Sequence, residues 1–261
     1  MNCATAVLEA VPVTDEPTPM GRQRADLALV ERKLFESRAK AQEAIAAGGV
    51  RADGRLVRKA SELIDASASI EAAPPYPWVS RGGVKLAAAL DAFGFDPAGL
   101  VCLDIGASTG GFAHVLLARR AAAVVAVDVG RGQLHSDIAS DPRVTSREAT
   151  DARGLEPGDL PQPPQLLTCD VSFISLILVL PAVLPLAAPD AKLIALIKPQ
   201  FEAGPAHVVK GIVRDPAIHE DVCARIDALI RSLGWRVEGL IPSPIAGGDG
   251  NREFLIGASR R

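Results

Sequence analysis

The sequence predicts an α/β protein in which a small α+β domain precedes a mostly parallel, doubly wound sheet. Apolar, strand-like segments alternate with helical segments over most of the chain, which is typical of this fold class. The length of 261 residues exceeds one average domain. A proline-rich stretch at residues 72–77 separates the two parts, since consecutive prolines favour extended, stiff backbone.

The larger part contains seven candidate strands. They are Leu100–Asp104, Ala123–Asp128, Val144–Arg147, Leu166–Asp170, Ala191–Ile197, Arg236–Ile241 and Arg252–Gly257. No helical stretch separates the last two, so they are expected to form a closing antiparallel pair. In the smaller part the pattern predicts a helix over Arg24–Phe35 and a second helix from a Ser37 cap to Ala47. Two short strands are expected around Asp53-Gly54.

These patterns divide the chain into four segments. Residues 1–21 are rich in proline and polar residues and are expected to be a disordered leader. Residues 22–71 form the small domain, 72–78 the linker, and 79–261 the sheet domain.

The charge is unevenly distributed along the chain. The net charge is −3, yet residues 22–60 hold ten Lys or Arg against five Asp or Glu. Such a basic block predicts a confined surface for a polyanion, although a solvated helix face is the plainer interpretation. The candidate RNA-contacting residues are Arg22, Arg24, Arg38, Lys40, Arg51 and Arg55, with Ser80 and Arg81 beyond the linker.

Cysteine usage and hydropathy argue against a metal site and a membrane span. The four cysteines show no metal-ligand spacing, so no metal is expected, and a reducing, cytoplasmic compartment fits them. Residues 171–188 carry no charge, but Pro181 and Pro185 favour a buried strand end and helix. The first twenty residues lack the pattern of a signal peptide. We therefore expect no membrane partner, and the sequence leaves the oligomeric state open.

A glycine-rich loop follows the first strand of the sheet and opens a helix. The loop residues proposed to bind a cofactor are Asp104, Gly106, Ala107, Ser108, Gly110, Gly111 and Phe112. Asp128 ends the next strand, where a carboxylate can accept from both hydroxyls of a ribose, and Asp151 is a candidate for an adenine amino group. A glycine-rich turn without a ligand is the alternative. The acid, strand and loop pattern resembles class I S-adenosylmethionine-dependent methyltransferases.

Four charged residues are expected to converge at the carboxyl edge of the sheet. Lys85 lies at the start of a helix, Asp170 and Lys198 end two strands, and Glu253 begins the last one. A ribose 2′-hydroxyl must lose its proton as it attacks a methyl sulfonium. A lysine can take that proton if burial or a second lysine lowers its pKa, whereas carboxylates orient ammonium groups and act in the opposite direction. Each residue alone is more simply a surface charge.

The order of these segments resembles the TlyA, or hemolysin A, family of ribosomal RNA 2′-O-methyltransferases from about Arg22 to Ile256. The resemblance implies an S4 RNA-binding domain followed by an FtsJ-like, Rossmann-like methyltransferase domain that uses S-adenosylmethionine. It implies that Lys85, Asp170, Lys198 and Glu253 are catalytic and that cytidine in ribosomal RNA is the substrate. The leader is longer, and the linker richer in proline, than the family pattern.

Three other functions remain open from the sequence. They are a non-catalytic RNA-binding or ribosome-assembly factor, a membrane-active hemolysin, and a methyltransferase acting on a base. Arg214 and His219 are candidate substrate contacts, with an ordinary surface histidine as the simpler interpretation of His219.

Overall fold

The computed structural model describes residues 21–247 and 250–260. The leader predicted for residues 1–21 therefore lies outside the described part of the chain, except for Gly21. The chain separates into two compact units, Met1–Pro77 and Trp78–Arg261, and each is described by itself.

The N-terminal unit is a small α+β fold. Its elements are β1 (Arg22–Arg24), α1 (Ala25–Glu31), α2 (Arg38–Ala46), β2 (Val50–Ala52), β3 (Arg55–Leu56), β4 (Leu63–Asp65) and β5 (Ile70–Ala72). β1 pairs with β4, and β2 lies between β3 and β5. Apolar residues of both helices and of the strands, such as Leu29, Ile45 and Val50, form one buried cluster.

Two local predictions for this unit can be compared with the structure. Ser37 caps α2, since its hydroxyl accepts from the Lys40 amide at 3.3 Å, as predicted. The first helix is shorter than predicted because it ends at Glu31. The backbone of Lys33 adopts a left-handed conformation (φ 59°) that stops the helical hydrogen bonds there.

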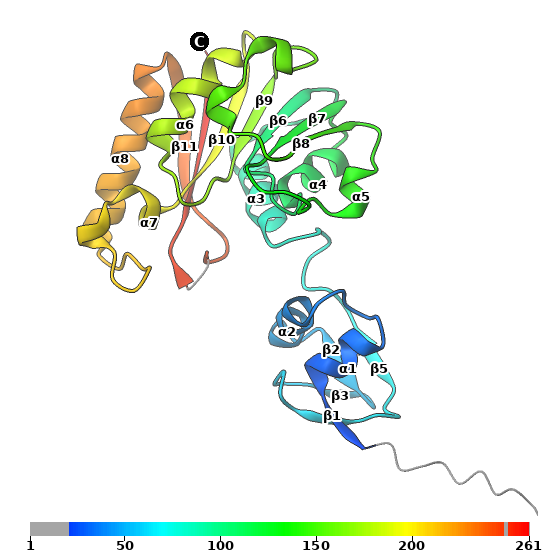
Figure 1. Ribbon diagram of the computed structural model, residues 1–261. Helices are drawn as coiled ribbons and strands as arrows, with labels where there is room; N and C mark the ends of the chain where they lie inside the picture. The colour runs from blue at the N-terminus through cyan, green and yellow to red at the C-terminus, as the bar shows by residue number, and fades with distance from the viewer. Residues whose placement is uncertain (1–20, 248–249, 261) are drawn as a thin grey trace, which may run out of the picture. The chain divides into compact units, whose positions relative to one another are not determined.

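The C-terminal unit is a doubly wound sheet of seven strands (Figure 1). The strands are β6 (Val101–Ile105), β7 (Ala123–Val127), β8 (Val144–Arg147), β9 (Leu166–Cys169), β10 (Lys192–Ile197), β11 (Trp235–Pro242) and β12 (Phe254–Arg260). Their order is β11-β12-β10-β9-β6-β7-β8, and β12 runs antiparallel to both of its neighbours. The predicted fold class and the closing antiparallel pair are therefore confirmed.

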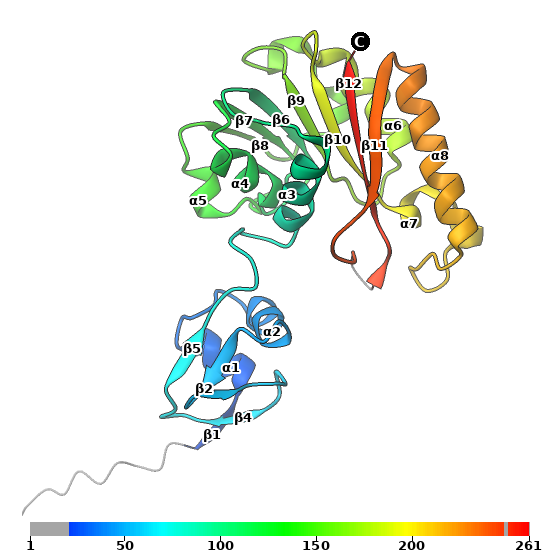
Figure 2. The ribbon, with the colours of Figure 1, turned by 180° about the vertical axis from the view of Figure 1, so that it is seen from behind.

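Helices cover both faces of this sheet (Figure 2). They are α3 (Gly82–Phe93), α4 (Gly111–Ala118), α5 (Ser136–Ala139), α6 (Leu176–Val183), α7 (Pro199–Glu202) and α8 (Pro216–Ser232). Side chains of α6 and α8 form one apolar cluster with the sheet, and side chains of α3 and α4 form another on the opposite face. Four short 3₁₀ turns complete the unit: Ala152–Gly154, Pro157–Asp159, Leu184–Leu186 and Pro205–His207.

The uncharged stretch at residues 171–188 forms a loop, α6 and a 3₁₀ turn, with Leu176, Val179 and Leu180 buried in the core. No helix in the described part of the chain has the length and apolar character needed to cross a membrane.

The strand order places the candidate site. The chain moves from β6 through β7 to β8, then returns to β9 on the other side of β6. The loops after β6 and β9 therefore separate at the carboxyl edge, and in doubly wound sheets ligands bind in the crevice at this point.

Candidate active site

The loop after β6 depends on glycine at two positions. Gly106 (φ 80°) and Gly110 (φ 89°) both have left-handed backbone conformations that favour glycine. A Cβ at position 106 would collide with the carbonyl oxygen of Asp170, and one at position 110 would lie 2.8 Å from Leu134. The loop can therefore pass directly over the end of β9, which leaves room beside it for a ligand.

Asp104 lies beneath this loop and is completely buried. One carboxylate oxygen accepts from the Thr168 hydroxyl at 2.8 Å, and the other has no hydrogen-bond partner among the described residues. Burial raises the pKa of Asp104 to about 7.

The raised pKa of Asp104 predicts a pH dependence of stability. A carboxyl whose pKa is higher in the folded state stabilises the fold fully below its unfolded value of about 4, and this contribution is lost as the pH rises through about 7. The free energy of unfolding should therefore fall over this range, and Asp104→Asn should flatten the fall. Urea unfolding between pH 4 and 8 measures it. The exposed Asp96→Asn is the control, and equal pH slopes for wild type and Asp104→Asn would contradict the prediction.

Asp128, directly after β7, is fixed by the backbone around it. Its two oxygens accept from the amides of Ser108 at 2.8 Å and Gly130 at 2.7 Å. An ionised carboxylate has about four acceptor positions, so two remain for the hydroxyls of a ribose. The structure thus brings Asp128 against the glycine loop, as the strand order predicts.

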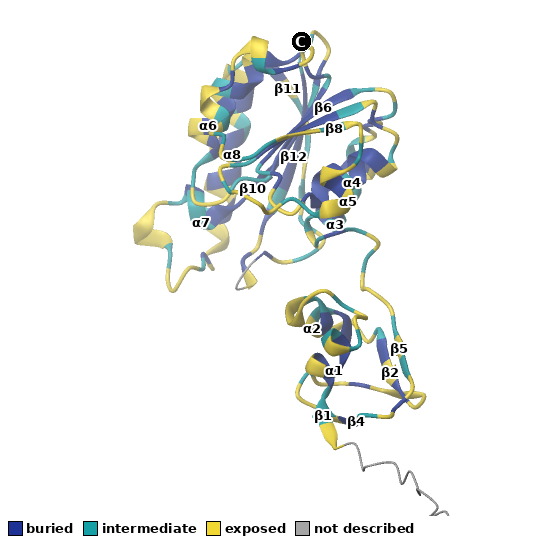
Figure 3. Cartoon of the chain, turned by 45° about the vertical axis from the view of Figure 1, so that its right-hand side comes forward, coloured by how far each residue is buried: buried dark blue, intermediate teal, exposed yellow. Residues whose placement is uncertain are grey.

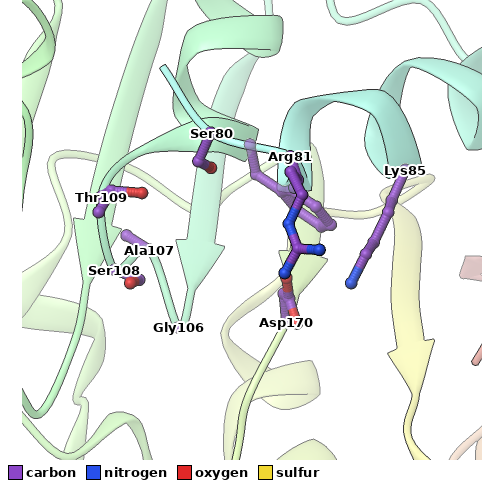
Figure 4. Close-up of a pocket in the computed structure, with 11 residues that line it drawn as sticks. Ser80, Arg81, Lys85, Gly106, Ala107, Ser108, Thr109 and Asp170 are labelled. Atoms are coloured by element: carbon purple, nitrogen blue, oxygen red, sulfur yellow. The ribbon is translucent and has the colours of Figure 1, made fainter. Parts of the chain in front are cut away.

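A cavity of about 230 Å³ lies between this loop and the start of α3 (Figure 4). It is lined by Ser80, Arg81, Gly82, Lys85, Gly106, Ala107, Ser108, Thr109, Gly111, Phe112 and Asp170. Nine of the predicted site residues are in this set, and Gly82 and Thr109 are additions. Asp151 is outside it, since its exposed carboxylate caps a 3₁₀ turn and pairs with Arg153 at 2.6 Å. Its contact with adenine stays a prediction.

The four candidate catalytic residues form two ion pairs. Lys85, in the first turn of α3, pairs with Glu253 at 2.5 Å, and Lys198, after β10, pairs with Asp170 at 2.6 Å. The side chains of these residues are between 2% and 19% exposed, so the pairs are largely shielded from water. Each lysine is paired with a carboxylate, the arrangement expected if Asp170 and Glu253 orient the two ammonium groups. The described structure thus favours carboxylates as the groups that orient the two ammonium groups.

Two further residues at this site, Ser172 and Glu202, were not identified as site residues from the sequence. The Ser172 hydroxyl accepts from Lys198 Nζ at 2.8 Å, so this ammonium is held from two sides. Glu202 on α7 accepts from the Ser175 hydroxyl at 2.5 Å and the Leu176 amide at 2.8 Å, which ties the loop after Asp170 to the segment after Lys198. Burial raises the pKa of Glu202. The available signal was that Ser172-Phe173 and Gln200-Phe201-Glu202 both lie within a few residues of a strand end that carries a charged residue.

Among the residues that the structure describes, Phe173 is the most exposed large apolar side chain, at 92%. Its backbone is left-handed (φ 64°), which is rare for a bulky residue and costs energy. Its ring packs on Phe201, with 5.1 Å between ring centroids. An aromatic ring held in the solvent next to the Lys198–Asp170 pair is suited to stack on a planar group.

The predicted RNA-contacting cations in the N-terminal unit have different surroundings. Arg24 and Arg38 both bind Asp26, which is fully buried and also accepts from Gln42 at 2.8 Å. The guanidinium of Arg24 holds the pKa of Asp26 well below its usual range. The remaining predicted residues are variously placed: Lys40 pairs with Glu36, Arg51 donates to the Gly54 carbonyl, and Arg22 and Arg55 are exposed on β1 and β3. Asp26 thus fixes two arginines that remain half exposed.

Asp26→Asn is expected to lower the stability of the N-terminal unit by about 1.5–3 kcal/mol, the range for a hydrogen bond to a charged group. Because the pKa of Asp26 is depressed in the fold, its contribution is present above the unfolded value of about 4 and is lost as the pH falls. Hydrogen exchange of the α1 amides at pH 7 measures the effect. Exposed Glu31→Gln on the same helix is the control, and equal protection in both variants would contradict the prediction.

His219 has a structural role, and its interpretation as an ordinary surface histidine is wrong. It is buried, and its Nε2 donates to the Val213 carbonyl at 2.9 Å. Arg214 is exposed beside it.

A doubly wound sheet with a glycine loop after its first strand and an acid after the next strand is typical of a class I methyltransferase fold. The chain belongs to the FtsJ-like methyltransferase family, which it matches over residues 78–260, and it matches the S4 domain over residues 23–70. It is therefore a methyltransferase, and S-adenosylmethionine is the cofactor that its fold and family require. The predicted resemblance is confirmed.

Similar proteins extend over most of the chain. The 16S/23S rRNA (cytidine-2'-O)-methyltransferase TlyA of Mycobacterium tuberculosis is 45% identical over 90% of this chain and 89% of its own length. Hemolysin A of Brachyspira hyodysenteriae is 38% identical over 84% of this chain and 92% of its own. A solved structure of a hemolysin-like protein from Streptococcus thermophilus is 40% identical, with a TM-score of 0.73 over 92% of this chain and 89% of that one.

Proposed function

We propose that this protein methylates the 2′-hydroxyl of a ribose, that of a cytidine, in ribosomal RNA in the cytoplasm. The observation that carries the proposal is the meeting of two shielded lysine–carboxylate pairs, drawn from four distant segments, beside the glycine-loop cavity. The relatives named as ribosomal RNA (cytidine-2'-O)-methyltransferases support the substrate, and the S4 match supports RNA as the partner.

Each residue of the site has a part in this reaction. Bound S-adenosylmethionine supplies an electrophilic methyl group on a sulfonium. Asp128 and the loop of Gly106 hold the cofactor. The ammonium of Lys198, positioned by Asp170 and Ser172, first releases a proton to solvent. The neutral Nζ then receives the proton of the attacking 2′-hydroxyl. Lys85 and Glu253 hold the ribose in line with the methyl group, since alignment contributes to the rate as much as proton transfer.

The test is methyl transfer from radiolabelled S-adenosylmethionine to unmethylated small and large ribosomal subunits. Label at alkali-resistant positions would support ribose methylation and identify the subunit and nucleotide. Label on a base would overturn the proposed chemistry. Absence of transfer to either subunit, with cofactor binding intact, would favour the non-catalytic assembly factor.

Phe173 provides a separate prediction. We expect Phe173→Ala to lower kcat/KM for ribosomal RNA by about 10- to 100-fold, because base stacking on an aromatic ring is worth about 1–3 kcal/mol. The free energy of unfolding should stay within about 0.5 kcal/mol of wild type, since the ring is exposed. Leu178→Ala, an exposed apolar residue on α6, is the control. Equal kcat/KM in the two variants would exclude a stacking role.

A further inference from the structure

The exposed cations of the C-terminal unit fall into two groups. Most of its arginines pair with a carboxylate of the same unit: Arg119, Arg143, Arg147, Arg153, Arg225, Arg231 and Arg236. Arg120 and Arg131 are exposed and form no ion pair or side-chain hydrogen bond with any residue that the structure describes, and the same holds for Lys210, Arg214 and Arg252. The last three lie close in sequence to the residues that anchor the segment before Glu253.

Lys210 occupies the tip of a tight two-residue turn. Val209 and Ile212 form an isolated β-bridge, with their amides and carbonyls joined at 2.9 and 3.1 Å. Lys210 (φ 51°) and Gly211 (φ 77°) both have left-handed backbones, as the two central residues of a type I′ turn require. This turn therefore holds the lysine backbone in one defined conformation.

The turn is attached to the segment that leads into Glu253. The buried Asn251 side chain donates to the Gly211 carbonyl at 2.9 Å and accepts from the Val213 amide at 3.3 Å. Gly211 and Val213 are the direct neighbours of Lys210 and Arg214, and Asn251 is the neighbour of Arg252. These bonds bring the three cations to one region, which we call the 210/214/252 surface.

The 210/214/252 surface lies at the carboxyl edge of the sheet. The loop after α7 and the β11–β12 connection project beyond the same edge (Figure 1), and the loop is largely exposed (Figure 3). Residues 203–214 contain no Asp or Glu. Three carboxylates close in sequence to these cations are already engaged: Glu253 with Lys85, Glu202 with Ser175, and Asp215 with the Ala217 amide. Unpaired cations on an anchored turn are suited to phosphate groups.

We propose that Lys210, Arg214 and Arg252 bind phosphates of the RNA strand that carries the target ribose. The proposal rests on the proposed function. It assigns to the methyltransferase unit an RNA surface of its own, separate from the cations of the N-terminal unit. The surface positions the strand at Glu253 without reading its bases.

The experiment compares full-length Lys210→Asn/Arg252→Gln with wild type in binding to ribosomal subunits over a range of salt concentrations. Asparagine tolerates the left-handed backbone at position 210. Arg119→Gln/Arg120→Asn is the matched control: it removes the same charge from the amino edge of the sheet, and Arg120 also has a left-handed backbone (φ 64°). Each lost phosphate contact reduces the slope of log K against log salt by about 1. For Lys210→Asn/Arg252→Gln, the slope of log K against log salt should therefore be shallower by about 2. At low salt this variant should bind about tenfold more weakly than wild type.

The outcomes separate this proposal from the proposed function. If Lys210→Asn/Arg252→Gln and the control variant show the same slope of log K against log salt, the proposed RNA surface is wrong, even if wild type methylates RNA. A reduced slope in the variant supports the surface, even if wild type transfers no methyl group and the proposed function fails. A wild type that binds no ribosomal subunit overturns both. Melting temperature and cofactor affinity close to wild type show that a weaker variant is folded.

Discussion

Lys198→Met is expected to lower kcat for RNA methylation by about 10²- to 10⁴-fold, the usual contribution of a general acid or base. Methionine keeps most of the apolar stem but removes the Nζ that contacts Asp170 and Ser172. Because the cofactor loop is formed by other segments, affinity for S-adenosylmethionine should remain close to that of wild type. Steady-state kinetics with ribosomal subunits and calorimetric titration of the cofactor measure the two quantities.

Lys192→Met is the matched control for this substitution. Lys192 lies on the same strand at its opposite end, with its ammonium 5.6 Å from the centre of the Phe95 ring, so it is remote from the site. Loss of one partner from a shielded ion pair also costs stability, so the unfolding free energy of both variants is needed. Retention of half of the wild-type kcat by a folded Lys198→Met would exclude Lys198 as the proton acceptor.

Gly106→Ala is expected to weaken binding of S-adenosylmethionine by more than about tenfold and to destabilise the C-terminal unit. An alanine in the left-handed conformation costs about 1–2 kcal/mol. In addition, its Cβ would press against the Asp170 carbonyl, so the loop and the end of β9 must separate. That movement would shift Asp170 relative to Lys198, and kcat should fall together with cofactor affinity.

Gly132→Ala is the control that separates the cost of a left-handed alanine backbone from the collision of the Cβ with the Asp170 carbonyl. Gly132 is also left-handed (φ 62°), but a Cβ there would meet no atom within 4 Å. Equal losses of stability and cofactor affinity in the two variants would show that backbone conformation alone matters. A larger loss in Gly106→Ala, seen by urea unfolding and cofactor titration, would support the close approach.

The sequence was sufficient for the architecture of the C-terminal unit and for the location of its site. Strand-length apolar runs ending in Asp170 or Lys198 identify the carboxyl edge, and parallel strands bring such ends together. The sequence was not sufficient to predict which carboxylate pairs with which lysine. Lys85 and Glu253 are separated by 168 positions, and local sequence patterns do not encode contacts between such distant residues.

The N-terminal unit was harder to predict for a different reason. Strands β1, β4 and β5 have three residues each, too few to show a period of two. The sequence predicted Arg24 and Arg38 as RNA contacts but not their shared bond to Asp26, because the burial of Asp26 beneath them arises from tertiary packing of α1 against α2. Phenylalanine is usually a core residue, so the exposure of Phe173 becomes apparent only in the folded structure.

The position of β12 has a consequence for how the site is assembled during synthesis. This strand is made after all the others, yet it is inserted between β10 and β11 and pairs with both. Until it arrives, β10 and β11 each have an open edge, and the Lys85 ammonium lacks its carboxylate because Glu253 directly precedes β12. Nascent chains can thus complete the cofactor half of the sheet first. The Lys85–Glu253 pair is completed in the same step that closes the sheet, so the candidate active site and a fully paired sheet are acquired together.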